Sequence, residues 1–372
     1  MFRVRIVALF VAACVTVSVI HAAPILQETE SGDPQIKSIN VISFAPQGVL
    51  LIGDGTGSQI VAIETGDDVT KPKIEHKVDG IAAKLAARLG TTSDGIEIID
   101  MAVNPASGTP YFAIRKQDDK RNLILTVDRQ GEIGEFELND VSHARIQLKA
   151  GKDNISRVTD VAWADTQIVA AGRSNETFAS KIFSIDVPLK HKSVGSVYSA
   201  ETYHVSHGRW ETKAPMSVLI PVRENDKTYV IGAFSCTPVV KYPLDSLQPG
   251  AQVKGASMIE LGSGNRPIDM FVYEKDGKSF VLSNTFRFHH ERKPFGPSPY
   301  WTVKFDQGLL SGDETVNEKA TRRLKGYEPV TDKISMAEAF HGVMQMDKLD
   351  RSHALVLRQN DEGISLEVLA LP

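Results

Sequence analysis

The stretch DMAVNPASGTPYFAIRKQDDKRNLILTVDRQG, residues 100–131, contains three short apolar runs separated by polar turns. The runs are rich in β-branched and aromatic residues, and Asn, Pro, Gly and Asp stand between them, which is typical of strands joined by tight turns. One such triplet cannot bury its own apolar faces. The stretch therefore predicts a single unit of a larger, repetitive assembly of strands.

The same triplet recurs along the chain. Copies begin near positions 41, 100, 160, 217, 269 and 342, and four of the five intervals lie between 52 and 60 residues. The last interval is 73 residues, because an insertion at 286–299 lengthens the fifth copy. A period of roughly 50 residues made of short strands is typical of a β-propeller, whose blades pack face to face around a central channel. A β-sandwich would not produce so regular a long period.

We therefore predict an all-β fold: one β-propeller domain over residues 34–372. Six blades match the six copies, and seven is the alternative count, because strand-like residues at 194–212 belong to no copy. One short helix is expected in the first connection between blades, where IAAKLAARL at 81–89 has apolar residues at helical spacing and Gly90 follows as a stop.

Residues 1–23 have the pattern of a secretory signal peptide. A short basic segment precedes an apolar run at 6–20, which at 15 residues is shorter than a bilayer span, and Ala22, Ala23 and Pro24 follow. The expected location is periplasmic or secreted, and a lipoprotein anchor at Cys14 is the minor alternative. No later segment is long and apolar enough to predict a membrane span.

Composition excludes several classes of function. The 372 residues carry a formal net charge of −4, which argues against a nucleic-acid binder that relies on a positive field. Two cysteines cannot build a disulfide framework, and without a C-x-x-C-H motif no covalently attached haem is expected. Neither a G-x-S-x-G elbow nor a dinucleotide-binding G-x-G-x-x-G opening a helix is present.

Polar residues recur where the first strand of a copy begins. Asp100, Asp160 and Asp269 share this register, and Asn40 and His341 stand at the start of the first and last copies. Carboxylates converging on a channel would repel one another unless a cation intervenes, and oxygen-rich rings suit Ca²⁺. These five residues are the candidate metal ligands. The other interpretation, which the sequence favours, is that each aspartate caps its strand by accepting backbone N–H groups.

A second set of functional side chains lies in YHVSHGRWET at 203–212 and in the nearby segments FSCTP and NRPID. Two histidines three residues apart do not predict a metal site on a loop or strand, and H-E-x-x-H is absent. The alternative is a loop packed by Trp210 with solvated charges. The candidate ligand-binding residues are His204, His207, Arg209, Glu211, Cys236, Asn265 and Arg266.

Several segments carry a family resemblance. HGRWET, SCTPVVKYPLDSLQPG, GNRPIDMFVYEKDGKSF and LSNT, between residues 207 and 285, resemble exported bacterial β-propeller proteins. NVISFAPQGVLLIGDGTGSQIVAIETGD at 40–67 resembles NHL- and YVTN-type propeller repeats. The resemblance implies a propeller and export, and it implies no particular activity.

Three functions are compatible with these observations. We expect a binding or scaffold protein that engages a protein or small-molecule ligand at its channel face, because no complete acid–base or nucleophile set is present. A Ca²⁺-dependent hydrolase of the lactonase or paraoxonase kind is the alternative, by analogy of fold alone. A cofactor-free propeller subunit of an extracytoplasmic redox complex is the third.

Overall fold

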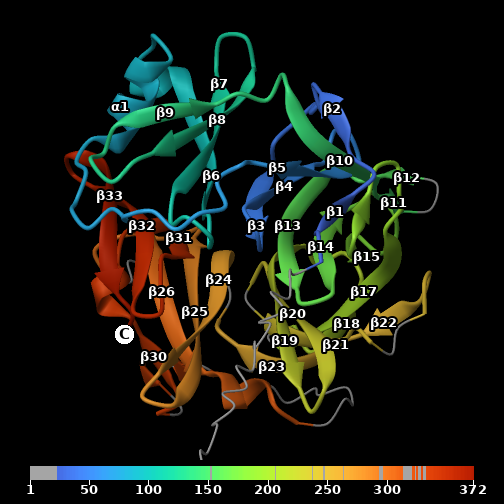
Figure 1. Cartoon of the computed structure of the whole chain (residues 1–372). Helices are drawn as coiled ribbons and strands as arrows, with labels where there is room; N and C mark the ends of the chain where they lie inside the picture. The colour runs from blue at the N-terminus through green and yellow to red at the C-terminus, as the bar shows by residue number, and fades with distance from the viewer. Residues whose placement is uncertain are drawn as a thin grey trace, which may run out of the picture.

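Each of the six triplets forms three antiparallel strands, and the six sheets stand as blades around a central channel in this computed structural model (Figure 1). The structure describes residues 23–150, 153–205, 207–236, 238–245, 248–262, 264–292, 296–312, 321–322, 324–325, 328–329 and 332–372. Residues 1–22 of the expected signal peptide lie outside these ranges, and Cys14 is among them.

The strands nearest the channel open each triplet, and each blade is named here by its innermost strand. These are β3 (Val41–Ala45), β6 (Ile96–Val103), β13 (Arg157–Ala164), β19 (Met216–Glu224), β24 (Asn265–Lys275) and β31 (Val343–Lys348). The second strands are β4 (Val49–Asp54), β7 (Pro110–Lys116), β14 (Gln167–Arg173), β20 (Lys227–Phe234), β25 (Lys278–Arg287) and β32 (His353–Asn360). The third strands are β5 (Gln59–Glu64), β8 (Asn122–Val127), β15 (Ser180–Asp186), β21 (Pro238–Pro243), β26 (Tyr300–Asp306) and β33 (Gly363–Ala370).

Five blades have a fourth strand that the sequence did not predict. These strands are β10 (Val141–Gln147), β9 (Ile133–Phe136), β17 (Ser196–His204), β23 (Ala256–Glu260) and β30 (Ile334–Met336). The unassigned residues 194–212 form β17 and β18 (Arg209–Glu211), which extend the β13 blade. They do not make a seventh blade, so the prediction of six is confirmed.

Shorter elements decorate the ring. β1 (Leu26–Gln27) pairs with β16 (Leu189–Lys190), and β2 (Glu30–Gly32) pairs with β10, so the ring takes in residues before position 34. The remaining short strands are β11 (Lys149–Ala150), β12 (Asp153–Asn154), β22 (Gln252–Lys254), β27 (Thr321–Arg322), β28 (Leu324–Lys325) and β29 (Glu328–Pro329). Single turns of 3₁₀ helix lie at η1 (Ser93–Gly95), η2 (Gln307–Leu310) and η3 (Glu338–Phe340). Among the described residues, no helix is long and apolar enough to cross a membrane.

The order of the blades around the ring differs from their order along the chain. The β3 blade lies between the β6 and β13 blades, and the β31 blade lies between the β24 and β6 blades. The chain therefore builds its second blade on one side of the first and returns through β10, the fourth strand of the β3 blade, to build the third on the other side (Figure 1). The ring closes between the β31 and β6 blades.

The predicted helix is confirmed as α1 (Ile81–Arg88), and it lies at this closure. Its buried face of Ile81, Leu85 and Ala86 packs among apolar side chains of the β6 and β31 blades. Just before the helix, Val78 exchanges two backbone hydrogen bonds with Leu366 of β33, at 2.9 and 3.0 Å. The first connection between blades therefore joins the two ends of the ring.

Apolar packing explains why the blades form a ring. The buried apolar side chains group into six clusters, and each cluster fills the interface between one pair of neighbouring blades. A blade buries both faces of its sheet, so its strands are continuous apolar runs rather than alternating ones. Since no blade can bury these faces alone, the ring is one folding unit.

Side-chain oxygens on the innermost strands link one blade to the next. Asp100 on β6 accepts a 2.7 Å hydrogen bond from the backbone N–H of Ile42 on β3. Asp160 on β13 accepts the same bond, at 2.7 Å, from Leu219 on β19. Both aspartates follow a β-bulge, a register shift that turns the carboxylate toward the neighbouring blade.

Three more joints are made in the same direction around the ring. Asp269 on β24 accepts from Met346 N–H at 2.8 Å, and Asp347 on β31 accepts from Val103 N–H at 2.7 Å. Asn40 accepts from the N–H of Val158 at 3.2 Å. The three predicted aspartates thus accept backbone N–H groups, as the capping hypothesis expected, but these donors lie on the next blade and not in the preceding turn.

We expect Asp160→Ala to lower the free energy of unfolding by about 1–3 kcal/mol, because the buried Leu219 N–H loses its acceptor. Chemical denaturation of the full chain measures this change. Glu75→Ala is the control, because Glu75 is an exposed loop residue. Equal stability of the two variants would contradict a linking role for Asp160.

Candidate functional site

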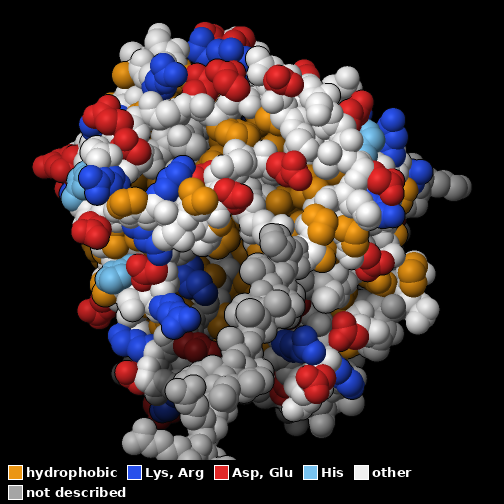
Figure 2. Space-filling view, viewed as in Figure 1, with side chains coloured by type: hydrophobic (Ala, Val, Ile, Leu, Met, Phe, Trp, Pro, Cys, Tyr) orange, Lys and Arg blue, Asp and Glu red, His pale blue; other side chains and the backbone are white. Residues whose placement is uncertain are grey.

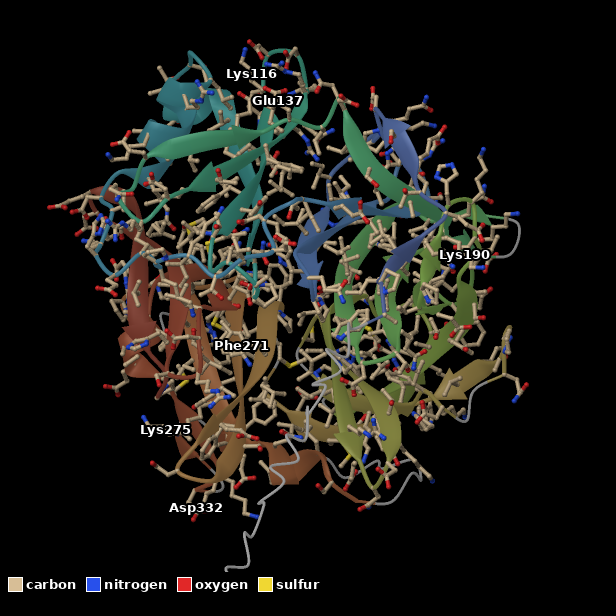
Figure 3. The ribbon with its side chains drawn as sticks, viewed as in Figure 1. Lys116, Glu137, Lys190, Phe271, Lys275 and Asp332 are labelled. Atoms are coloured by element: carbon tan, nitrogen blue, oxygen red, sulfur yellow. The ribbon has the colours of Figure 1, made fainter. Side chains whose placement is uncertain are left out.

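The innermost strands of all six blades enclose a channel of about 930 Å³. Toward the ends of these strands the lining is aromatic, with Phe44, Trp163 and Phe271. Figure 3 shows Phe271 near the middle of the ring, whereas Lys116, Glu137 and Lys190 lie at its rim. In the same view, apolar side chains are visible above and to the right of the centre of the face, among charged side chains that extend to the edge (Figure 2).

Where the innermost strands begin, the channel mouth is basic. Arg157 and Arg266 stand at the starts of β13 and β24, and Arg173 lies opposite Arg157 in the antiparallel pair of β13 and β14. All three line the channel and are exposed to solvent within its mouth. We name these three residues the arginine mouth.

The arginine mouth has an excess of positive charge. Partial burial, and then the nearby Arg266 and Arg115, hold the pKa of Arg157 below its usual range. Glu97, an acid on the lining, is 3.3 Å from the guanidinium of Arg115. Within the described chain, no hydrogen bond or ion pair forms on the side chains of Arg157, Arg173 or Arg266. Their donors face the open channel.

Aromatic rings flank the arginine mouth on one side. The guanidinium of Arg266 lies 5.9 Å from the ring centroid of Phe286, and the ring of Phe286 lies 5.2 Å from that of Tyr300. Tyr300 also lines the channel, and burial raises the pKa of its phenol. The mouth thus combines planar cationic donors with flat apolar surface.

The carboxylates deeper in the channel are held in an unfavourable environment. Burial raises the pKa of Asp100 to about 7, of Asp160 to about 8 and of Asp347 to about 6, although backbone N–H groups lower each value. Burial and the neighbouring Asp100 raise the pKa of Asp269 well above its ordinary value. Repulsion from neighbouring aspartates adds to the effect at Asp100, Asp160 and Asp269.

The predicted metal ligands are distributed as follows. Asn40, Asp100, Asp160 and Asp269 all line the channel, and each bonds backbone N–H groups. His341 lies outside the channel lining, with its ring against Gly296 of the insertion. Ca²⁺ binding by these residues stays a prediction.

The predicted ligand-binding residues fall into two groups. Arg266 lines the channel, and its neighbour Asn265 is buried and accepts a 3.1 Å bond from the Trp301 indole. The backbone N–H of Cys236 donates to the Asn265 carbonyl at 2.8 Å. The other four belong to the hairpin of β17 and β18 at the outer edge of the β13 blade, and none of them lines the channel: His204, His207, Arg209 and Glu211.

Sequence reasoning missed Arg157 and Arg173. The signal for Arg157 was present, because it precedes Asp160 by three residues just as Arg266 precedes Asp269. Glu97 precedes Asp100 by the same interval. Aligning the copies on their aspartates therefore predicts charged side chains at one end of the channel. Arg173 follows from the antiparallel pairing that places it beside Arg157.

Comparison with known proteins shows distant likeness of fold. No family model matches the chain, and no curated protein matches it. Among solved structures it is similar to hydrazine synthase of Kuenenia stuttgartiensis, at 10% identity and a TM-score of 0.33, covering 91% of this chain and 97% of that one. It is also similar to the major allergen Mala s 1 of Malassezia sympodialis, at 10% identity and a TM-score of 0.36, covering 92% and 96%. An α-L-arabinanase of Cellvibrio cellulosa has 12% identity and a TM-score of 0.32, covering 76% and 97%.

The raised carboxylate pKa values predict a pH dependence of stability. A folded-state pKa above the unfolded value means that folding favours the protonated carboxyl group. The contribution of these groups to the free energy of unfolding is therefore fully present below about pH 4 and is lost as pH rises through about 7–8. Asp160→Asn removes one such group. Denaturation at about pH 5 and about pH 9 should therefore show a smaller loss of stability in the variant than in the natural chain. An identical loss in both would contradict the assigned shift.

Proposed function

We propose that this chain is a binding protein that captures a small anionic ligand at the arginine mouth of its channel. A propeller fits a binding or scaffold role. The observation that carries the proposal is three arginines whose side chains have no hydrogen-bond or ion-pair partner among the described residues, facing a channel of about 930 Å³. A channel of this size accommodates a small organic molecule.

The chemistry of the mouth favours a carboxylate or a phosphate group. A guanidinium presents donors in a planar fork that matches the two oxygens of such groups. Several like charges around a concave site also concentrate the field there and attract an anion. Phe286 and Tyr300 offer flat apolar surface beside Arg266, so we infer that the ligand has an unsaturated or apolar body attached to its acidic group.

We infer that the protein works outside the cytoplasm, exported by residues 1–23, whose composition supports this. No feature of the described residues specifically favours the hydrolase or the redox subunit. The Ca²⁺ ligands expected for a hydrolase are used in joints between blades, and that use supports a scaffold role for the channel wall.

Binding of inorganic phosphate and of mono-, di- and tricarboxylates by the full chain tests the proposal, with isothermal titration calorimetry as the readout. We expect Arg157→Ala and Arg266→Ala each to weaken binding of the best ligand about 10- to 100-fold, because a charged hydrogen bond contributes about 1.5–3 kcal/mol. Arg223→Ala is the matched control, since Arg223 lies on the innermost strand β19 but outside the channel lining.

Binding that is equally strong in Arg157→Ala, Arg266→Ala and Arg223→Ala would contradict the proposed site. Failure of every anion in the panel to bind the natural chain would contradict the proposed ligand class.

A further inference from the structure

The hairpin of β17 and β18 brings together three side chains that ligate metals. A turn in which the N–H groups of His207 and Gly208 both donate to the carbonyl of His204 reverses the chain. Nδ1 of His207 then lies 2.9 Å from one carboxylate oxygen of Glu211, and Nε2 of His204 lies 3.6 Å from the other. One ligand atom from each of the three residues lies within 4.8 Å of the others.

Of the three side chains, that of His204 has the fewest hydrogen bonds for its polar atoms. Its side chain is 3% exposed, and neither of its ring nitrogens has a hydrogen-bond partner in the described structure. Buried polar atoms nearly always have a partner, so two unpaired nitrogens on one buried ring need an explanation. A neutral imidazole has one nitrogen with a free lone pair, which can bind a cation.

We propose that His204, His207 and Glu211 bind a Zn²⁺ ion. Two imidazoles and one carboxylate are a donor set that zinc takes in proteins, with a fourth position open to water. From Glu211 to His207 and to His204, the donor atoms lie 2.9 and 3.6 Å apart, close to the roughly 3.4 Å that bonds of about 2.1 Å impose in a tetrahedron. The two imidazole rings are nearly parallel, with planes at 9° and centroids 5.1 Å apart, so the partly exposed ring of His207 would turn to share the ion. The ion would supply the partner that His204 lacks.

A second cluster in the same chain has the same donor set, but an arginine side chain already contacts it. Glu30, His143 and His191 also lie within 4.8 Å of one another. There the guanidinium of Arg145 is 3.0 Å from the Glu30 carboxylate and 3.5 Å from Nε2 of His191. Because the guanidinium of Arg145, which is only 23% exposed, already neutralises the Glu30 carboxylate, we expect no metal at this cluster. It serves as an internal control.

Arg209 competes with the metal at the proposed site. Its Nε lies 3.0 Å from the Glu211 oxygen that also contacts His207. The side chain of Arg209 is 73% exposed, so it can leave the carboxylate without uncovering apolar surface. Removing its charge should therefore strengthen metal binding.

The position of the site gives it a structural consequence. β18 is the outermost strand of its blade, paired with β17 on one side, and an exposed strand edge is a point of weakness in a sheet. Zn²⁺ would join β18 to β17 through side chains as well as backbone. Metal binding should therefore raise the melting temperature.

Titration of the chelator-treated full chain with Zn²⁺ tests the proposal. We expect one saturable site, weakened at least about tenfold by His207→Ala and by Glu211→Gln, because each removes a ligand. His191→Ala is the matched control and should bind as the natural chain does, whereas Arg209→Ala should bind more tightly. Since His207 is partly exposed, its replacement should preserve the fold. The circular dichroism spectrum of the variant, compared with that of the natural chain, checks this.

A second readout uses Co²⁺ in place of zinc. A tetrahedral site with nitrogen and oxygen ligands gives visible absorption bands, which His207→Ala should abolish and His191→Ala should leave unchanged. Absence of saturable Zn²⁺ binding, or loss of binding in His191→Ala instead of His207→Ala, would overturn the proposal. The arginine mouth is tested separately, because Arg157 and Arg266 contribute no ligand to this site.

Discussion

The structure depends on a bond that is repeated around the channel: an oxygen on one innermost strand accepts a backbone N–H from the innermost strand of the next blade. Asp100, Asp160, Asp269, Asp347 and Asn40 make five such joints, all in the same direction. Apolar packing between blades has little directional preference, whereas these bonds fix register. Because these bonds direct carboxyl groups toward the channel, the fold gathers acidic side chains along its middle, where burial raises their pKa values and backbone donors partly offset the rise.

The joints between blades use none of the three residues of the arginine mouth. On three innermost strands, a charged side chain lies three residues before the aspartate. Two of these side chains are Arg157 and Arg266. The residues that hold the ring together and those proposed to bind a ligand are thus neighbours on the same strands. Strands packed on both faces fix the backbone positions of the arginines, so only their side chains lose freedom when an anion is bound.

The sequence predicted most of the fold, because strands buried on both faces leave long apolar runs. It missed β9 (Ile133–Phe136), whose residues are all partly exposed and carry a weak apolar signal. It also missed the order of the blades, since nothing local in β10 indicates that it returns to the first blade. At the sites, the register of the aspartates was visible in the repeats. The metal cluster was not, because only the reversal at Gly208 brings His204 and His207 beside Glu211.

The most direct test of the binding proposal is a crystal structure of the full chain grown with selenate, whose anomalous scattering locates the anion without ambiguity. We expect selenate at the channel mouth, within hydrogen-bonding distance of the guanidinium groups of Arg157 and Arg266. A mouth without an anion, with these arginines paired to acidic side chains of the channel instead, would contradict it.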